Sequence, residues 1–464
     1  MSKPFKLLLI NPINQHRKGL LRDKHAIYPP LSLGIIAALT PSHWHIELLD
    51  ENFEDFSFRL ADLVAFTSFT STVNRAYELS AIYRARGIKT VIGGIHASMM
   101  PEEASAHCDV VVINEAEGVW AKLIHDFENN QLQTFYRGKW QSLEGMPVAR
   151  RDLFHPGYVF GSLQTSRGCP MKCDFCSVHT FNGSKYRQRP INEVLDEFET
   201  IPQQRIFVVD DNLIGYSKQS AERAKEFFRG IIARGIKKDW FCQASINVAD
   251  DEEVLQLAAT SGCRLILLGL ESEKMEALKD VHKTLNAKRG VGQYAEVFER
   301  LHKHGIGVLG TFIMGMESDA EQDLTNRADY IIDSTIDAIQ TTIMTPLPGT
   351  GLFNRYLKEN RLLYTNFPSD WSKYHFGEVV FKPLTMSSAQ LSECIRLQAG
   401  RMYEPKSLKR RFMQSLKLTG NAVTASWAYA SNLQYRNILF EHEKRLTIDD
   451  MMIGQQFSDN KENA

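Results

Sequence analysis

Three of the chain's seven cysteines lie within eight residues, in the stretch TSRGCPMKCDFCSVH. Cys169, Cys173 and Cys176 follow the spacing CxxxCxxC. Three thiolates from one short loop can bind three irons of a cubane cluster and leave the fourth iron open to another ligand. Structural zinc needs a closed set of four ligands, which usually come as two spaced pairs. The spacing therefore favours an iron–sulfur cluster, and zinc on the three cysteines and His179 is the alternative.

The cysteines must be positioned by the strand that precedes them, which we place at residues 162–166. Five further strands with helical segments between them follow, at 205–209, 241–246, 264–270, 307–313 and 338–343. Six strand–helix units predict an open or partial barrel of the (β/α)6 TIM type, in which catalytic residues sit at the carboxyl ends of the strands. The cysteine stretch begins at such an end.

The first part of the chain also alternates strands and helices. We expect strands at 6–10, 45–50, 63–68, 89–94 and 110–114, with helices at 31–40 and 74–86. This α/β pattern predicts a doubly wound parallel sheet that binds a ligand beyond the carboxyl ends of its strands. A dinucleotide would need a glycine-rich turn after the first strand. Residues 11–30 instead form a long loop, which favours a bulkier ligand.

We divide the chain into a first domain at 1–135, a linker at 136–158, a barrel domain at 159–345 and a mostly helical C-terminal region at 346–464. The linker is polar and contains Gly138, Gly145 and Pro147. In the C-terminal region, residues 406–418 predict a helix with one apolar and one basic face. We favour a helix that packs on the barrel with a solvated face, and peripheral contact with a membrane or an anionic substrate is the alternative.

The composition is that of an ordinary globular protein, and we expect the chain to lie in the cytoplasm. Lys and Arg (54) nearly balance Asp and Glu (55), so we expect no nucleic-acid partner. The apolar run near the start is too short for a signal peptide's hydrophobic region, so we expect none, and no run approaches the ~18 apolar residues of a spanning helix. Thiols stay reduced in the cytoplasm, and we expect the four scattered cysteines to be buried and free. They are Cys108, Cys242, Cys263 and Cys394.

With Phe175 just before its last cysteine, the motif resembles that of radical S-adenosylmethionine (SAM) enzymes. The resemblance covers most of residues 161–343 and implies a [4Fe-4S] cluster on Cys169, Cys173 and Cys176. It further implies that SAM chelates the open iron, and that an electron from a donor such as flavodoxin or ferredoxin releases a 5′-deoxyadenosyl radical. The fourth ligand would then be SAM rather than His179.

The same resemblance implies SAM contacts at three more strand ends. Family members often carry a glycine-glycine-glutamate turn after the second strand, where this chain has Asp210 and Asp211. These acids either replace that turn or are ordinary turn residues. The ends of strands three and four supply the remaining candidates, which are Gln243, Ser245, Glu271 and Ser272.

The first domain resembles the cobalamin-binding domain of one branch of this family. The resemblance rests on NP, YPPLSLG, FTSFTSTV, GGIHASMMPEE and INEAEG, which occur in that order. Small and hydroxyl residues at strand ends would let a large flat ligand approach the backbone. Ordinary turn residues of a plain sheet are the alternative. The implied cobalamin contacts are Asn11, Tyr28, Ser32, Thr67, Ser68, Thr70, Gly93, Gly94, His96, Glu115 and Gly118.

A lower axial histidine for cobalamin would require Asp-x-His-x-x-Gly after the first strand. The chain has Asn14 where the aspartate should orient the ring of His16. Members of this branch generally lack the ligand, so we expect His16 to be an exposed loop residue.

The resemblance implies methylation of an unactivated carbon in a small-molecule or lipid-like substrate. The adenosyl radical would remove a hydrogen atom, and the carbon radical would take the methyl group of methylcobalamin. Ring formation, oxidation or rearrangement with the same cofactors is one alternative. A zinc-stabilised nucleic-acid-binding or regulatory protein is a more distant one.

Overall fold

The computed structural model describes residues 5–14 and 28–440. The chain divides into two compact units, each formed from two segments. The first unit contains residues 1–213 and 345–382, and the second contains residues 214–344 and 383–464. The cysteine stretch belongs to the first unit, together with the whole N-terminal sheet.

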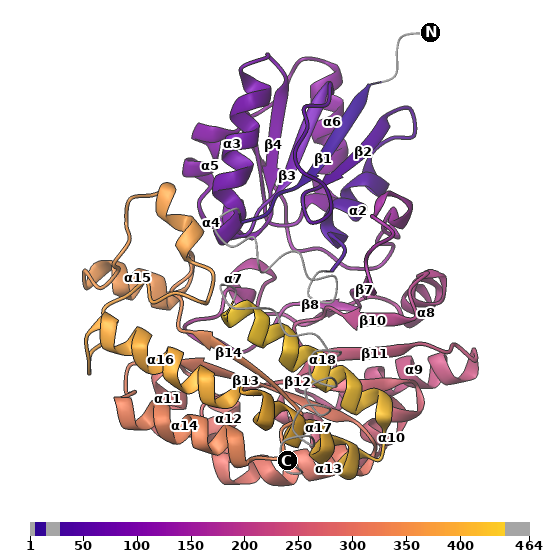
Figure 1. The fold of residues 1–464 in the computed structure, drawn as a ribbon. Helices are drawn as coiled ribbons and strands as arrows, with labels where there is room; N and C mark the ends of the chain where they lie inside the picture. The colour runs from indigo at the N-terminus through magenta and orange to yellow at the C-terminus, as the bar shows by residue number, and fades with distance from the viewer. Residues whose placement is uncertain (1–4, 15–27, 441–464) are drawn as a thin grey trace, which may run out of the picture. The chain divides into compact units, whose positions relative to one another are not determined.

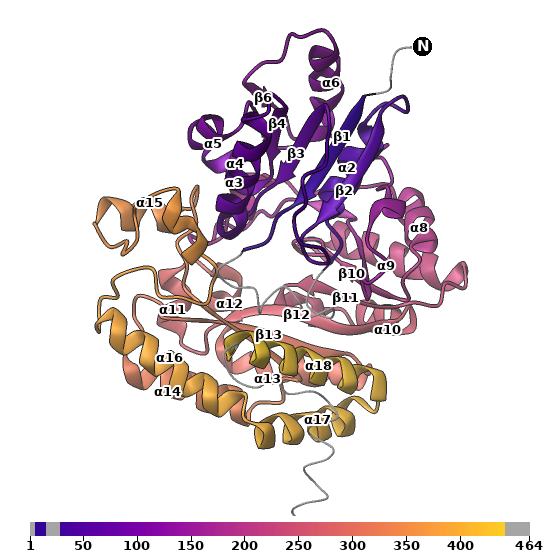
Figure 2. The same ribbon diagram turned by 45° about the horizontal axis from the view of Figure 1, so that its top comes forward.

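The N-terminal sheet has six parallel strands in the order β2-β1-β3-β4-β5-β6. The strands are β1 (Lys6–Asn11), β2 (His45–Asp50), β3 (Leu63–Thr67), β4 (Lys89–Gly93), β5 (Val110–Ile113) and β6 (Phe135–Arg137). Helices α2 (Leu31–Leu39) and α6 (Trp120–Glu128) cover one face, and α3 (Val73–Arg84), α4 (Ile95–Met99) and α5 (Pro101–His107) cover the other (Figures 1 and 2).

Burial on both faces explains why these strands read as continuous apolar runs. Leu7 and Leu9 of β1 pack with Leu33 of α2 and Trp120 of α6, and Leu8, on the opposite side of the strand, is also fully buried. Parallel strands covered by helices on both sides show this pattern instead of strict alternation. The doubly wound sheet predicted from the sequence is confirmed.

One strand of this sheet was not predicted. β6 lies in the polar stretch that we assigned partly to a linker, and it pairs with β5 through Val112 and Tyr136. It is only three residues long and has no apolar run, so its pattern does not differ from that of a loop. Its place at the edge of the sheet comes from this pairing with β5.

The second sheet also has six strands, in the order β14-β13-β12-β11-β10-β7. The first unit contributes β7 (Phe160–Leu163) and β10 (Arg205–Val208), which are parallel and linked by α8 (Ile191–Thr200). The second unit contributes β11 (Asp239–Ala244), β12 (Cys263–Glu271), β13 (Gly307–Met314) and β14 (Ala338–Ile343). The strands follow one another in chain order, as the predicted strand–helix units require.

The second unit surrounds its strands with helices. They are α9 (Lys218–Ala233), α10 (Glu252–Thr260), α11 (Met275–Asp280), α12 (Thr284–Arg289), α13 (Tyr294–Lys303), α14 (Glu321–Asp333), α16 (Ser388–Met402), α17 (Pro405–Thr419) and α18 (Ala422–Leu439). Figure 1 shows α18 lying across β12, β13 and β14, and Asn432 of α18 binds the backbone of Ile339 and Asp337.

The predicted basic amphipathic helix is α17. Leu408 is fully buried and Phe412 packs edge-on against Tyr429 of α18, whereas Lys409 and Lys417 are exposed. The helix therefore packs within the second unit and presents a basic outer face. No helix in the described part of the chain is long and apolar enough to cross a membrane.

Candidate functional site

The cysteine loop is closed at its neck by two short antiparallel strands, β8 (Ser166–Arg167) and β9 (Arg187–Gln188). Gly168 leads from β8 into the loop with φ +96°, and a Cβ there would lie 2.2 Å from the Lys185 carbonyl oxygen. Only glycine fits this close approach. The backbone N–H of Cys169 donates to the Gly183 carbonyl at 3.1 Å, which further fixes the first cysteine.

The loop itself has irregular backbone until the short helix α7 (Val178–Phe181). Cys173 is buried, and Cys169 and Cys176 are half-buried. None of the three forms a disulfide, and the N–H of Cys176 donates to the Cys173 carbonyl at 3.0 Å. Three cysteines outside any disulfide, on one loop with fixed ends, fit a cluster held at three corners. Phe175 lies between two of them and is half-buried.

Two acids at the end of β10 hold the start of the loop, and they do so differently. Asp210 is fully buried, and its carboxylate accepts hydrogen bonds from the backbone N–H and hydroxyl of Thr165 and from the hydroxyl of Ser166. Asp211 accepts from the Gly168 N–H at 3.3 Å and from the Asn182 amide at 3.0 Å. Burial raises the pKa of Asp211, and the charge of Asp210 adds to this effect.

A segment far along the chain contacts the other side of the loop. The N–H of Leu352, in α15 (Gly351–Lys358), donates to the Asp174 carbonyl at 3.0 Å, and the Thr180 hydroxyl donates to the Gly349 carbonyl at 3.4 Å. Residues 345–382, which we assigned to the C-terminal region, therefore pack in the same unit as the cysteines.

A cavity of about 680 Å³ lies within the first unit, where the ends of the N-terminal strands meet the cysteine loop. Its lining contains nine of the residues predicted from the sequence, which are Asn11, Tyr28, Ser32, Thr67, Ser68, Gly93, Gly94, Glu115 and Asp211. Residues before and after the cysteines complete the wall, among them Gln164, Arg167, Val178, Phe181 and Asn182. The cavity thus joins the two predicted cofactor regions.

The cavity lining combines many apolar side chains with a smaller number of hydroxyl, amide and charged groups. Gly94 has φ +99°, and a Cβ at this position would lie 2.8 Å from the Ser68 carbonyl oxygen, so the backbone of β3 and β4 can approach closely here. Apolar side chains such as Ile13 and Phe66 lie beside the hydroxyls of Ser32 and Thr67. This mixture is typical of cofactor sites, and it fits the predicted cobalamin.

Other predicted cobalamin contacts lie away from the cavity lining. His96 is fully buried, with Nδ1 3.3 Å from the Thr70 hydroxyl and Nε2 3.2 Å from the Glu103 carboxylate. Trp371 of the 345–382 segment donates its indole N–H to Glu103 at 2.9 Å. His96 and Thr70 therefore belong to a buried network that ties this segment to the N-terminal domain.

Gly118, another predicted cobalamin contact, also lies away from the cavity lining. A Cβ at Gly118 would lie 1.8 Å from the Gln141 side chain, so this glycine allows the linker to pack closely. His16 lies outside the described residues, and its expected exposure stays a prediction. Its neighbour Asn14 is buried and donates to the Ser372 carbonyl at 3.0 Å.

The remaining predicted SAM contacts belong to the second unit. Glu271 ends β12 with φ +64°, a left-handed conformation that costs energy in a non-glycine residue, and it forms an ion pair with Lys283 at 2.7 Å. The Ser245 hydroxyl donates to the Tyr216 hydroxyl at 2.9 Å. Gln243 is half-buried in β11. The sequence did not identify Lys283, because a lysine twelve residues further on carries no spacing signal.

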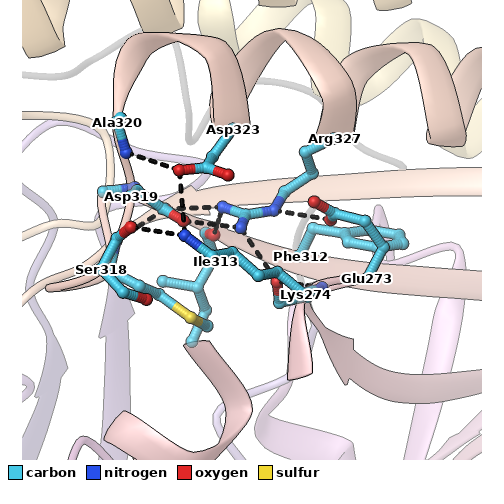
Figure 3. Close-up of polar contacts among 12 residues, drawn as sticks. Glu273, Lys274, Phe312, Ile313, Ser318, Asp319, Ala320, Asp323 and Arg327 are labelled. Atoms are coloured by element: carbon cyan, nitrogen blue, oxygen red, sulfur yellow. Dashed lines mark hydrogen bonds and ion pairs between the residues drawn. The ribbon is translucent and has the colours of Figure 1, made fainter. Parts of the chain in front are cut away.

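A buried arginine holds the next residues of this segment (Figure 3). Arg327 of α14 is fully buried and donates to both carboxylate oxygens of Asp319, to Glu273 at 2.9 Å and to the Ser272 hydroxyl at 2.9 Å. Asp319 also accepts the backbone N–H groups of Gly315 and Met316. The network fixes the segments that follow β12 and β13.

The zinc alternative would need Cys169, Cys173, Cys176 and His179 to converge. Among the residues that the structure describes, no three His, Cys, Asp or Glu side chains are grouped as a metal site. His179 sits in α7, and its buried Nδ1 has no hydrogen-bond partner among residues 5–14 and 28–440.

Comparisons with known proteins agree with this geometry. Residues 163–331 match the model of the radical SAM superfamily, and residues 18–124 match that of the B12 binding domain. The chain is 30% identical to bacteriochlorophyllide d C-12(1)-methyltransferase of Chlorobaculum tepidum, over 88% of this chain and 89% of that protein. It is 24% identical to hopanoid C-2 methylase of Rhodopseudomonas palustris, over 86% of this chain and 75% of that protein.

A solved structure shows the same fold. The radical SAM methyltransferase TsrM from Kitasatospora setae, with cobalamin and a [4Fe-4S] cluster bound, superposes with a TM-score of 0.61 at 19% identity and covers 85% of this chain and 82% of that one. The predicted fold class, radical SAM enzyme and cofactors (the cluster, SAM and cobalamin) are confirmed at the level of the family. The chain therefore belongs to the B12-binding radical SAM enzymes, a family that includes these methyltransferases.

Proposed function

We propose that the chain is a cobalamin-dependent radical SAM methyltransferase that methylates an unactivated carbon of a large, mostly apolar small molecule. The observation that carries the proposal is the similarity to bacteriochlorophyllide d C-12(1)-methyltransferase along almost the whole of both chains. Similarity to hopanoid C-2 methylase supports an apolar substrate, because both substrates named are large hydrocarbon-rich molecules.

In this proposal each part of the first unit has one task. Cys169, Cys173 and Cys176 hold the [4Fe-4S] cluster, and the cavity at the strand ends holds cobalamin. When bound, the cluster and SAM supply radical chemistry, and cobalamin supplies a carrier for the methyl group. The protein orients these groups, and the mostly apolar cavity wall limits access of water to reactive species.

The strand ends of the second unit supply the remaining polar contacts for SAM in this proposal. Glu271 ends β12 and Ser272 follows it, and Lys283 and Arg327 hold them in fixed orientations. A side chain whose rotamer is fixed by a charged partner loses less entropy when it binds a ligand.

The proposal is tested with anaerobic, reconstituted enzyme, a chemical reductant and SAM that carries a CD3 methyl group. The enzyme is incubated with a tetrapyrrole of the bacteriochlorophyllide type, a hopanoid and, as a polar control, tryptophan. We expect a CD3 group on carbon in one of the two apolar substrates, and none with the Cys176→Ala variant. A product that forms without the label would contradict methyl transfer and favour oxidation or rearrangement.

A further inference from the structure

Two arginines face each other at the neck of the cysteine loop and bind one carboxylate. Arg167 and Arg187 are direct partners in the β8–β9 pair. An Arg167 guanidinium nitrogen lies 3.3 Å from Glu115 Oε1, and Arg187 donates to Oε2 of the same group at 2.9 Å and also to Oε1. The single carboxylate of Glu115 therefore bridges the two strands that enter and leave the loop.

Glu115 comes from the other cofactor region. It lies two residues after β5 of the N-terminal sheet and just before the turn η3 (Ala116–Gly118), which also holds Glu117. Arg167 donates to Glu117 at 2.6 Å. Two carboxylates at the end of the proposed cobalamin-binding sheet thus hold two guanidinium groups at the base of the cluster loop. The four charges sum to zero.

This network is buried and well ordered by further contacts. Arg167 is 9% exposed and Glu115 is 8% exposed. Arg187 also donates to the backbone carbonyls of Gln141 and Asn182. Burial raises the pKa of Glu115, but the hydrogen bond from Arg187 and the charges of both arginines lower it more, so the carboxyl stays ionised.

Net stability is a poor explanation for such a network. A buried ion pair adds little to the free energy of unfolding compared with well-packed apolar residues, because both charges must be desolvated. They do fix geometry, since a guanidinium fork binds a carboxylate in a defined direction. Glu115, Glu117 and Arg167 all line the cavity. The network therefore sits in the wall where the sheet and the loop meet.

We propose that Glu115, bound by Arg167 and Arg187, is a positioning residue that sets the distance between the cluster loop and the cobalamin-binding sheet. The inference rests on the proposed function. The network would keep Cys169, Cys173 and Cys176, which would hold the cluster, at a fixed distance from the strand ends that would hold cobalamin. Loss of the network should leave both cofactors bound but uncouple radical formation from methyl transfer.

The test compares Glu115→Gln with Glu197→Gln in the holoenzyme. Glu197 of α8 is a matched control, because it is also buried and also binds two arginines, Arg151 and Arg189, and it does not line the cavity. Pulsed dipolar EPR measures the distance between the reduced cluster and cob(II)alamin. Iron and cobalt content and thermal unfolding are recorded for each variant.

We expect a broader and shifted distance distribution in Glu115→Gln, and a wild-type distribution in Glu197→Gln. The ratio of 5′-deoxyadenosine to methylated product should rise roughly tenfold or more in Glu115→Gln, since displacements near 1 Å can cost a hundredfold in rate. Arg187→Lys keeps the positive charge but loses the two-point guanidinium contact with Glu115, so its distance distribution and product ratio should lie between those of wild type and Glu115→Gln. This variant replaces Glu115→Gln in the test if Glu115→Gln does not fold.

A wild-type distance distribution in a folded, loaded Glu115→Gln or Arg187→Lys enzyme would overturn the inference, as would equal changes in Glu197→Gln. The EPR distance requires no methyl transfer. If the wild-type enzyme forms no methylated product, the proposed function fails, and the distance measurement still decides whether Glu115 positions the loop.

Discussion

Asp210 accepts two hydrogen bonds from Thr165, one from the backbone N–H at 2.6 Å and one from the hydroxyl at 2.6 Å. A third comes from the hydroxyl of Ser166, and no part of the Asp210 side chain reaches solvent. The end of β10 is thereby fixed to the residues that lead into the cysteine loop. Asp210 acts as a support for the loop, and Asp211 is the acid that faces the cavity.

The Asp210→Ala variant should be less stable than wild type and should also bind less iron–sulfur cluster. Three buried donors lose their acceptor, so we expect the free energy of unfolding to fall by about 2–4 kcal/mol. Iron content after reconstitution should fall as well, because the loop entrance is no longer fixed. Chemical denaturation and iron analysis measure both effects. Asp333→Ala, at an exposed position in α14, is the control, and equal losses in the two variants would refute the role.

Asp211→Asn should stabilise the protein at neutral pH. Burial raises the pKa of Asp211 above its ordinary value, so its carboxyl favours folding when protonated and this contribution is lost as the pH rises through the raised pKa. Asparagine carries no charge and can still accept from the Gly168 N–H. The melting temperature of the variant should exceed that of wild type at pH 7, and the difference should shrink towards pH 4. A difference that is constant with pH would contradict this assignment.

Removing Arg327 should be among the most costly changes in the second unit. Arg327→Met leaves the buried Asp319 carboxylate without its cation, and breaking such a pair costs about 3–5 kcal/mol. Arg327→Lys restores a charge without the two-point contact and should recover part of the loss. Arg396→Met, in an exposed pair with Glu393, should change stability little. Urea unfolding of the three variants measures their free energies of unfolding. An Arg327→Met variant as stable as wild type would contradict the stabilising role of Arg327.

Glu271→Gln should weaken SAM binding without loss of the cluster. Glu271 is held by Lys283 and has a strained backbone, as expected for a residue fixed for ligand contact. Replacing a charge-assisted hydrogen bond by a neutral one should raise the Kd for SAM about tenfold. The cluster EPR spectrum, titrated with SAM, reports this affinity. Glu276→Gln in α11, whose side chain is exposed, is the control. An unchanged Kd for SAM in Glu271→Gln would show that Glu271 does not contact SAM.

The sequence predicted the strands well because strands depend on local pattern. The residues that end β3 and β4, such as Thr67 and Gly93, line the cavity simply because parallel strands end at the same edge. The motif likewise located the cluster loop, since its three cysteines are neighbours in the chain.

What the sequence did not predict depends on contacts between distant segments. Arg187 and Glu115 are 72 residues apart, and Trp371 and Glu103 are 268 apart, so no spacing rule connects them. For the same reason His96, assigned to the cofactor from its motif, sits in a buried network with Glu103. β6 was missed because a strand of three residues carries no periodicity.

The most direct test of the proposed function uses the substrate that accepts the CD3 group in the labelling experiment, deuterated at the carbon that accepts the methyl group. Mass spectrometry measures deuterium in 5′-deoxyadenosine and the methyl group gained by the product. We expect one deuterium in 5′-deoxyadenosine for each methyl group transferred. Methylation without deuterium in 5′-deoxyadenosine, or deuterium transfer without methylation, would contradict it.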